Sequence, residues 1–207
     1  IDLALSAINN EKIKTDKSLT DKYLKMINEE NKRMNKQVEN VLKISQLDRN
    51  KISLIKNPYN VHDVLDEASK RISLLLKSKN GKIDLNYGAD KSTFPLSFED
   101  ITNVFINILE NSIKYSTNNP EISVKTYNLN DKLYINFKDN GMGISNKVKS
   151  KIFDKFFRVS KGNIHNVKGH GLGLSFVKKI IDLHNGTISV NSELGKGSQF
   201  IISFNLK

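Results

Sequence analysis

Asparagines recur at helical spacing between residues 97 and 116, where the apolar pattern predicts a helix. At 100° per residue, Asn103, Asn107, Asn111 and Lys114 share one face of that helix. Asparagine is a poor helix former, so local propensity gives no reason for this face. An asparagine oxygen can ligate Mg²⁺, and a lysine offers a mobile charge to a phosphate. The face suggests a polyanion or metal–phosphate site, with a solvated polar stripe as the alternative.

A second string, Asp-Asn-Gly-Met-Gly-Ile at 139–144, follows a predicted strand. Its glycines allow a tight turn and let a ligand approach the backbone closely. Asp139 at its head could accept a hydrogen bond from a buried amino group. The string is weak evidence by itself, because turns favour these residue types.

A third string, Gly-His-Gly-Leu-Gly-Leu at 169–174, opens a predicted helix. Glycines at a helix N-terminus form an anion cradle, because free N–H groups and the positive end of the helix dipole meet there. The string matches neither the P-loop nor the Rossmann fingerprint. The preceding loop carries Arg158, Lys161 and Lys168, which suits a mobile basic lid.

The order of these strings resembles the sensor histidine kinases of two-component signalling, in particular Bacteroidetes-type enzymes. These kinases belong to the larger GHKL class of ATPases, which includes gyrase B and MutL. The resemblance covers nearly the whole chain. In chain order, the matching segments are the N box at 107–116, the G1 box at 139–144, the F box at 152–158, the G2 box at 169–174 and a last glycine box at 195–198, with Ser198 where Thr is usual.

The resemblance implies a Mg-ATP site and phosphoryl transfer by positioning and charge neutralisation. Asn111 would ligate Mg²⁺, and Asn107 would support it by hydrogen bonding. Lys114 would contact phosphate, and Arg158 would reach the γ-phosphate or anchor the lid. Asp139 would accept the adenine amino group, the main base-selective contact. The other residues expected around ATP are Tyr115, Gly141, Gly143, Ile144, Gly169, His170, Gly171, Leu172, Gly173, Leu174 and Ser198.

The phosphoacceptor of the family is a histidine in a His-Glu-x-Lys-Thr-Pro-like H box, and the sequence has no such string. Residues 1–8 resemble the helix just after that box, which places the box two to three helical turns upstream. The chain is therefore expected to bind ATP without autophosphorylating. His62 is interpreted as a cap or surface residue and His184 as structural, while His165 and His170 fall in the basic loop.

The first region, 1–55, has no Gly or Pro and is predicted to be helical. It would contain the end of one helix at 1–9 and a second helix at about 19–48, capped by Ser18 or Thr20. One apolar stripe cannot stabilise such a long helix alone, so an antiparallel hairpin that dimerises into a four-helix bundle is expected. Packing onto the second region is the alternative. The heptad positions of the stripe are Leu24, Ile27, Asn31, Met34, Val38, Val41 and Ser45.

The second region, 56–207, alternates element types and predicts an α+β fold. With the resemblance, this becomes an α/β sandwich with a mixed sheet and helices on one face, the Bergerat or GHKL fold. Ser97 and Asp100 are placed like a capping box. The expected helices are 61–77, 97–116, 147–157 and 172–183, and the expected strands are 83–87, 122–127, 133–139, 187–191 and 199–205. The apolar positions of the first helix are Val61, Val64, Leu65, Ala68, Ile72 and Leu75.

Composition sets limits on the remaining functions. The chain has 207 residues, 33 Lys+Arg against 22 Asp+Glu, a net charge of +11 and no cysteine. Disulfides, thiolate metal sites and a cysteine nucleophile are excluded. The positive charge is compatible with nucleic acid, an anionic membrane, a polyanionic small molecule or a lysine-rich solvated surface. Only a few of these charges are expected to meet the triphosphate.

The resemblance also implies the partners and the location. It implies a homodimer through the helical bundle, a response regulator receiver domain as partner, and the cytoplasmic domain of an inner-membrane protein. A gyrase/MutL-type ATPase is the alternative, although that class has Glu where this chain has Asn107. A nucleic-acid-binding adaptor is disfavoured because clustered arginines and aromatic stacking platforms are missing, so no nucleic-acid partner is expected.

Overall fold

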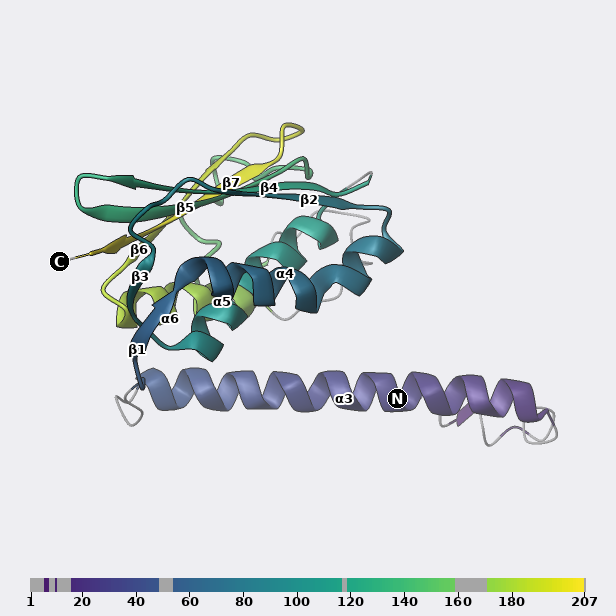
Figure 1. Cartoon of the computed structure of the whole chain (residues 1–207). Coiled ribbons are helices and arrows are strands. Elements are labelled where there is room, and N and C mark those ends of the chain that lie inside the picture. The colour runs from purple at the N-terminus through teal and green to yellow at the C-terminus, as the bar shows by residue number, and fades with distance from the viewer. Residues whose placement is uncertain are drawn as a thin grey trace. The chain divides into compact units, whose positions relative to one another are not determined.

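The computed structural model describes residues 6–7, 10, 16–48, 54–116, 119–158 and 171–206 (Figure 1). The chain divides into two compact units, Ile1–Ile52 and Ser53–Lys207. Within the described residues, no helix combines the length and the apolar character that a membrane span requires.

The first unit consists mainly of one long helix, α3 (Lys17–Asp48). The cap differs from the expected Ser18 or Thr20, because the Asp16 carboxylate accepts a hydrogen bond from the Leu19 amide at 3.1 Å. An acceptor at this position satisfies one of the N–H groups that every helix start leaves unpaired. The expected helix at 1–9 lies largely outside the described residues.

Three apolar positions of the α3 stripe are exposed among the described residues. Leu24, Met34 and Val38 are 52%, 48% and 57% exposed. An isolated helix with such a stripe loses the burial that normally stabilises it. The stripe is therefore available for a partner helix.

The second unit is built on a five-stranded mixed sheet with strand order β2-β4-β5-β7-β6. The β2–β4 pair is parallel and the other pairs are antiparallel. Helices α4, α5 and α6 cover one face of this sheet (Figure 1), which confirms the α+β fold with a mixed sheet. The strands are β2 (Lys82–Tyr87), β4 (Glu121–Leu129), β5 (Lys132–Asp139), β6 (Thr187–Ser192) and β7 (Ser198–Asn205), and the helices are α4 (Val61–Ser78), α5 (Phe98–Lys114) and α6 (Gly173–Leu183).

A separate two-stranded sheet, β1 (Asn57–Asn60) with β3 (Thr93–Leu96), was not expected from the sequence. The strands pair antiparallel, with Pro58 opposite Pro95. Proline lacks the amide donor of a sheet ladder, which is why this short pair gives no strand signal.

The observed α4 helix differs from the sequence interpretation in two ways. Its buried stripe ends on Leu76, whereas Leu75 is 41% exposed. Asn60, not His62, caps the helix, since its side-chain oxygen accepts the His62 amide at 2.9 Å. The His62 ring is half-buried and stacks on Tyr87 at 4.3 Å.

The start of α5 is not a capping box. The Ser97 hydroxyl donates to the Asp100 carboxylate at 2.7 Å and makes no cap bond to the helix backbone. The Ser97 amide instead donates to Nε2 of His184 at 3.0 Å, while Nδ1 lies 2.8 Å from the Ile180 carbonyl. His184 is buried and joins the start of α5 to the end of α6, in agreement with a structural role.

The segment 147–157 forms consecutive turns and not the expected helix. The amides of Val148, Lys151 and Asp154 each donate to a carbonyl three residues earlier. Phe156 then adopts a left-handed φ of 62°, which interrupts any helix there.

Candidate functional site

The polar face of α5 stands beside a buried apolar face. Phe105 and Ile108 are fully buried, whereas Asn107 and Asn111 are half-buried. The Asn107 amide nitrogen donates to the Asn103 carbonyl at 2.8 Å. Asn111 forms no side-chain hydrogen bond with any other described residue. Within the described part of the chain, the side-chain oxygen of Asn111 is therefore available to coordinate a cation.

Asp139, at the end of β5, is held by three hydrogen bonds. One carboxylate oxygen accepts the amides of Gly141 at 2.9 Å and Ser198 at 3.0 Å. The other oxygen accepts the Ser112 hydroxyl at 3.2 Å. Only 8% of the residue is exposed, and burial raises the pKa of the carboxyl group while the three hydrogen bonds lower it. The orientation of this acceptor is fixed by α5, β5 and β7 together.

The turn after Asp139 is held between α5 and the β6–β7 connection. The Met142 amide donates to the Tyr115 carbonyl at 3.0 Å, and the Gly195 amide donates to the Met142 carbonyl at 2.8 Å. Gly143 has a φ of +71°, and a Cβ there would lie 1.9 Å from the Glu193 carbonyl oxygen. Only glycine fits this position.

One residue further on, the Ile144 amide donates to the Ser192 hydroxyl at 2.8 Å. That hydroxyl in turn bonds the Gly197 carbonyl at 2.7 Å and lies 3.0 Å from the Ser198 hydroxyl. Residues 139–144 therefore have a defined conformation, set by contacts far away in sequence.

The N-terminus of α6 approaches the polar face of α5 closely. A Cβ at Gly173 would lie 2.8 Å from the Asn107 side-chain oxygen. Leu172 precedes the helix without a side-chain cap, so the first amides remain available to an anion. Gly171 accepts the Phe156 amide at 3.0 Å, which brings the two described segments flanking 159–170 together.

Two cationic groups lie near Tyr115, at the C-terminal end of α5. The Lys114 ammonium lies 5.1 Å from the centre of the Tyr115 ring. Burial raises the pKa of the Tyr115 phenol, and the charge of Arg158 lowers it. Arg158 is therefore close enough to act on Tyr115. Gly169, His170, Lys161 and Lys168 lie outside the described residues, as does His165.

Most of the expected site residues that the structure describes are connected in this way. Asn107 lies against Gly173, Tyr115 lies near Arg158, and Asp139 bonds the amides of Gly141 and Ser198. Ile144 and Ser198 share the Ser192 hydroxyl as a neighbour. Sequence reasoning missed Ser112 and Ser192 as supports of the site. A serine within the buried stripe of α5 was the visible signal for Ser112.

The described residues contain no group of three His, Asp or Glu side chains that could hold a metal ion. Mg²⁺ in phosphate sites often takes only one or two protein oxygens, with the rest from phosphates and water. The Asn111 amide, which bonds no other side chain or carbonyl in the described part of the chain, fits such a minimal donor set.

Known proteins similar to this chain identify the family. Residues 98–207 match the model described as histidine kinase-, DNA gyrase B-, and HSP90-like ATPase. Sensor protein RprX of Bacteroides fragilis (strain YCH46) is 42% identical over 186 residues, covering 87% of this chain and 35% of RprX. Signal transduction histidine-protein kinase ArlS of Staphylococcus aureus (strain USA300) is 34% identical over 192 residues, covering 92% of this chain and 42% of ArlS.

Solved structures agree with this family. The catalytic domain of histidine kinase ThkA has a TM-score of 0.60 and 25% identity, covering 72% of this chain and 95% of that domain. Full-length ShkA has a TM-score of 0.77 over 89% of this chain and 38% of ShkA, and at 20% identity it shows the fold alone. The chain spans less than half the length of RprX and ArlS. It belongs to the histidine kinase-, DNA gyrase B- and HSP90-like ATPase family, among the sensor histidine kinases.

Proposed function

We propose that this chain is the ATP-binding kinase core of a two-component sensor histidine kinase. It binds Mg-ATP between α5, residues 139–144 and the N-terminus of α6, and donates the γ-phosphoryl group to a histidine on a dimerisation helix. That phosphoryl group is then relayed to an aspartate of a response regulator. The observation that carries the proposal is the buried Asp139, which three hydrogen bonds hold against Ser112 of α5, Gly141 and Ser198.

Each part of the site has a role in this proposal. Asp139 accepts the adenine amino group, and Ile144 and Leu174 line the base. Asn111 supplies an oxygen to Mg²⁺, which neutralises phosphate charge when bound, while Asn107 holds the neighbouring end of α6. The remaining positive groups, Lys114 and Arg158, meet the phosphates. Arranged in this way, the chain lowers the barrier by positioning and charge compensation.

Two relatives support the nucleotide and the partner. The ShkA structure is a complex with AMPPNP, and another ThkA structure is a complex with the response regulator protein TrrA. By analogy, this chain would act with a receiver domain. The exposed stripe of α3 supports a homodimer through paired helices. A membrane anchor in the whole protein is part of the same proposal.

The experiment is phosphorylation in trans. The chain is incubated with γ-labelled Mg-ATP and a dimerisation helix pair that carries a His-Glu-x-Lys-Thr-Pro-like string. We expect acid-labile, base-stable label on the histidine of the added helices. Asn111→Ala should abolish the label. Asn103→Ala, on the same helix face but outside the proposed site, should keep it. Acid-stable label on serine or threonine would refute the proposal.

A further inference from the structure

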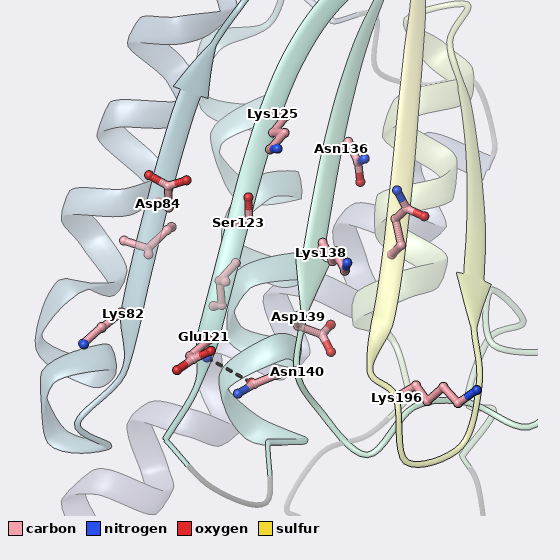
Figure 2. A pocket seen from close by; sticks show the side chains of 13 residues that line it. Lys82, Asp84, Glu121, Ser123, Lys125, Asn136, Lys138, Asp139, Asn140 and Lys196 are labelled. Carbon is pink, nitrogen blue, oxygen red and sulfur yellow. Dashed lines mark hydrogen bonds between the residues drawn. The ribbon is translucent and has the colours of Figure 1, made fainter.

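The face of the sheet opposite the helices, the open sheet face, carries a polar hollow of about 840 Å³ (Figure 2). Asn140 belongs to its lining and immediately follows Asp139 of the proposed nucleotide site. Figure 2 shows the hydrogen bond that joins Asn140 to Glu121, the first residue of β4. Asp139 and Asn140 are the two polar side chains of the string 139–144, and the nucleotide contacts proposed above use only Asp139.

The Asn140 side chain is bonded to the connection between α5 and β4. Its Oδ1 atom accepts the Glu121 amide at 2.9 Å and, in a longer contact, the Ser116 hydroxyl at 3.4 Å. Its Nδ2 group donates to the Asn119 carbonyl at 3.1 Å. The Asn140 backbone amide also donates to the Glu121 carbonyl at 3.3 Å. One side chain therefore holds described residues at both ends of this connection.

The same connection begins at the end of α5 that the proposed function assigns to the phosphates. Lys114 is the last residue of α5 and Tyr115 is its C-cap, with the Lys114 ammonium 5.1 Å from the centre of the Tyr115 ring. The Tyr115 carbonyl accepts the Met142 amide at 3.0 Å. The bonds of Asn140 begin one residue beyond Tyr115. They therefore restrict how far the end of α5 can move from the string 139–144.

This clamp is separate from the bonds that orient Asp139. The Asp139 carboxylate is held by Ser112, Gly141 and Ser198, and none of these three bonds involves Asn140. Removal of the Asn140 side chain should therefore leave the proposed adenine acceptor in place. The end of α5 would lose a restraint at the same time. The two parts of the site can thus be perturbed independently.

We propose that Asn140 is a positioning residue that preorganises Lys114 and Tyr115 for the triphosphate. It acts through the connection between α5 and β4 and not by contact with the nucleotide. Groups that are already ordered bind a ligand more tightly, because less conformational entropy is lost when the ligand arrives. This inference rests on the proposed function, and its test distinguishes a failure of one from a failure of the other.

The test compares the affinities of the whole ¹⁵N-labelled chain for Mg-ATP and for adenosine, both measured by NMR titration. Asn140→Ala should weaken Mg-ATP binding about threefold to tenfold, the effect of one net hydrogen bond. Adenosine affinity should stay within about twofold, because adenosine has no phosphates and Asp139 keeps its bonds. A loss of stability alone would not change the ratio of the two affinities in the folded protein.

Asn128→Ala is the matched control. Asn128 makes a similar clamp near the other end of β4, where it accepts the Lys91 amide and donates to the Lys91 carbonyl, each at 2.9 Å. This substitution removes an asparagine clamp of the same kind away from the proposed site. Both affinities should therefore stay unchanged.

A second variant covers a failure of Asn140→Ala to fold. Asn140→Ser keeps a small polar side chain that turns accept, but it is too short for the bond to the Asn119 carbonyl, and it should show the same selective loss. Unchanged Mg-ATP affinity in a folded variant, or equal losses for Mg-ATP and adenosine, would overturn the positioning role. So would an equal loss of Mg-ATP affinity in Asn128→Ala. A wild-type chain without saturable Mg-ATP binding would refute the proposed function, and this inference with it.

Discussion

Replacing Asp139 by asparagine should separate nucleotide binding from folding. The asparagine oxygen can still accept the amides of Gly141 and Ser198, which lie 2.9 and 3.0 Å away. Its NH₂ group then faces the Ser112 hydroxyl, which can turn its own proton to the Ile108 carbonyl at 3.2 Å. The native hydrogen bonds are retained in weaker, uncharged form, and the desolvation of a buried carboxylate disappears.

The expected change in unfolding free energy is therefore small, within about 1 kcal/mol. The adenine amino group, in contrast, meets a donor where it had a charged acceptor. A hydrogen bond to a charged group contributes about 1.5–3 kcal/mol, so ATP affinity should fall roughly 10- to 150-fold. Asp139→Ala should reduce both quantities, because two buried amides lose their acceptor at about 1–3 kcal/mol each.

The assay is calorimetric titration of ATP and GTP, with urea unfolding of the same samples. The asparagine variant should also shift preference towards GTP, whose carbonyl oxygen can accept the new NH₂ group. Unchanged ATP affinity in a folded Asp139→Asn protein would refute the adenine contact. A loss of stability as large as in the alanine variant would refute the proposed retention of the hydrogen bonds.

Three further predictions concern other parts of the chain. Gly143→Ala should lower the midpoint of thermal unfolding much more than Gly195→Ala, because both have positive φ but only the first Cβ would collide with backbone; equal losses would contradict this. Burial lowers the pKa of His184, so the unfolding free energy should decline as pH falls below about 6.5, where only the unfolded state takes up the proton. His184→Gln should flatten that decline in urea titrations at several pH values, and an unchanged slope would count against it. Val38→Lys should weaken the dimer in sedimentation, while the exposed control Asn35→Lys should not; a wild-type monomer at high concentration would refute the pairing.

Periodic patterns predicted much of the fold. The α5 helix follows its apolar spacing, with Phe105 and Ile108 buried and Asn107 and Asn111 on another face. The β4–β5 hairpin also forms, although its strands extend to a two-residue turn at Asn130 and Asp131, both with positive φ. Alternation and helical spacing succeed here because one face of each element is buried.

Predictions failed where tertiary contacts decide the local conformation. The β1–β3 pair forms between two strands that α4 and β2 separate along the chain. Its prolines, Pro58 and Pro95, also remove the usual sequence signal of a strand. At the start of α5, Ser97 has the right residue type for a capping box, but His184, 87 residues away, accepts its amide instead. The expected helix at 147–157 ends in the left-handed Phe156.

The arrangement of the proposed site residues could not be predicted from the sequence. Asp139 was identified from its place before two glycines, yet its orientation depends on the Ser198 amide, 59 residues later.

The most direct test of the nucleotide site is an NMR titration of the ¹⁵N-labelled chain with AMPPNP and Mg²⁺. The proposed nucleotide site predicts saturable shifts of backbone amides at Asn111, Gly141 and Gly173, while the amides of Lys125 and Asn136 on the open sheet face stay unchanged. The largest shifts on the open face, or no saturable shift at all, would contradict it.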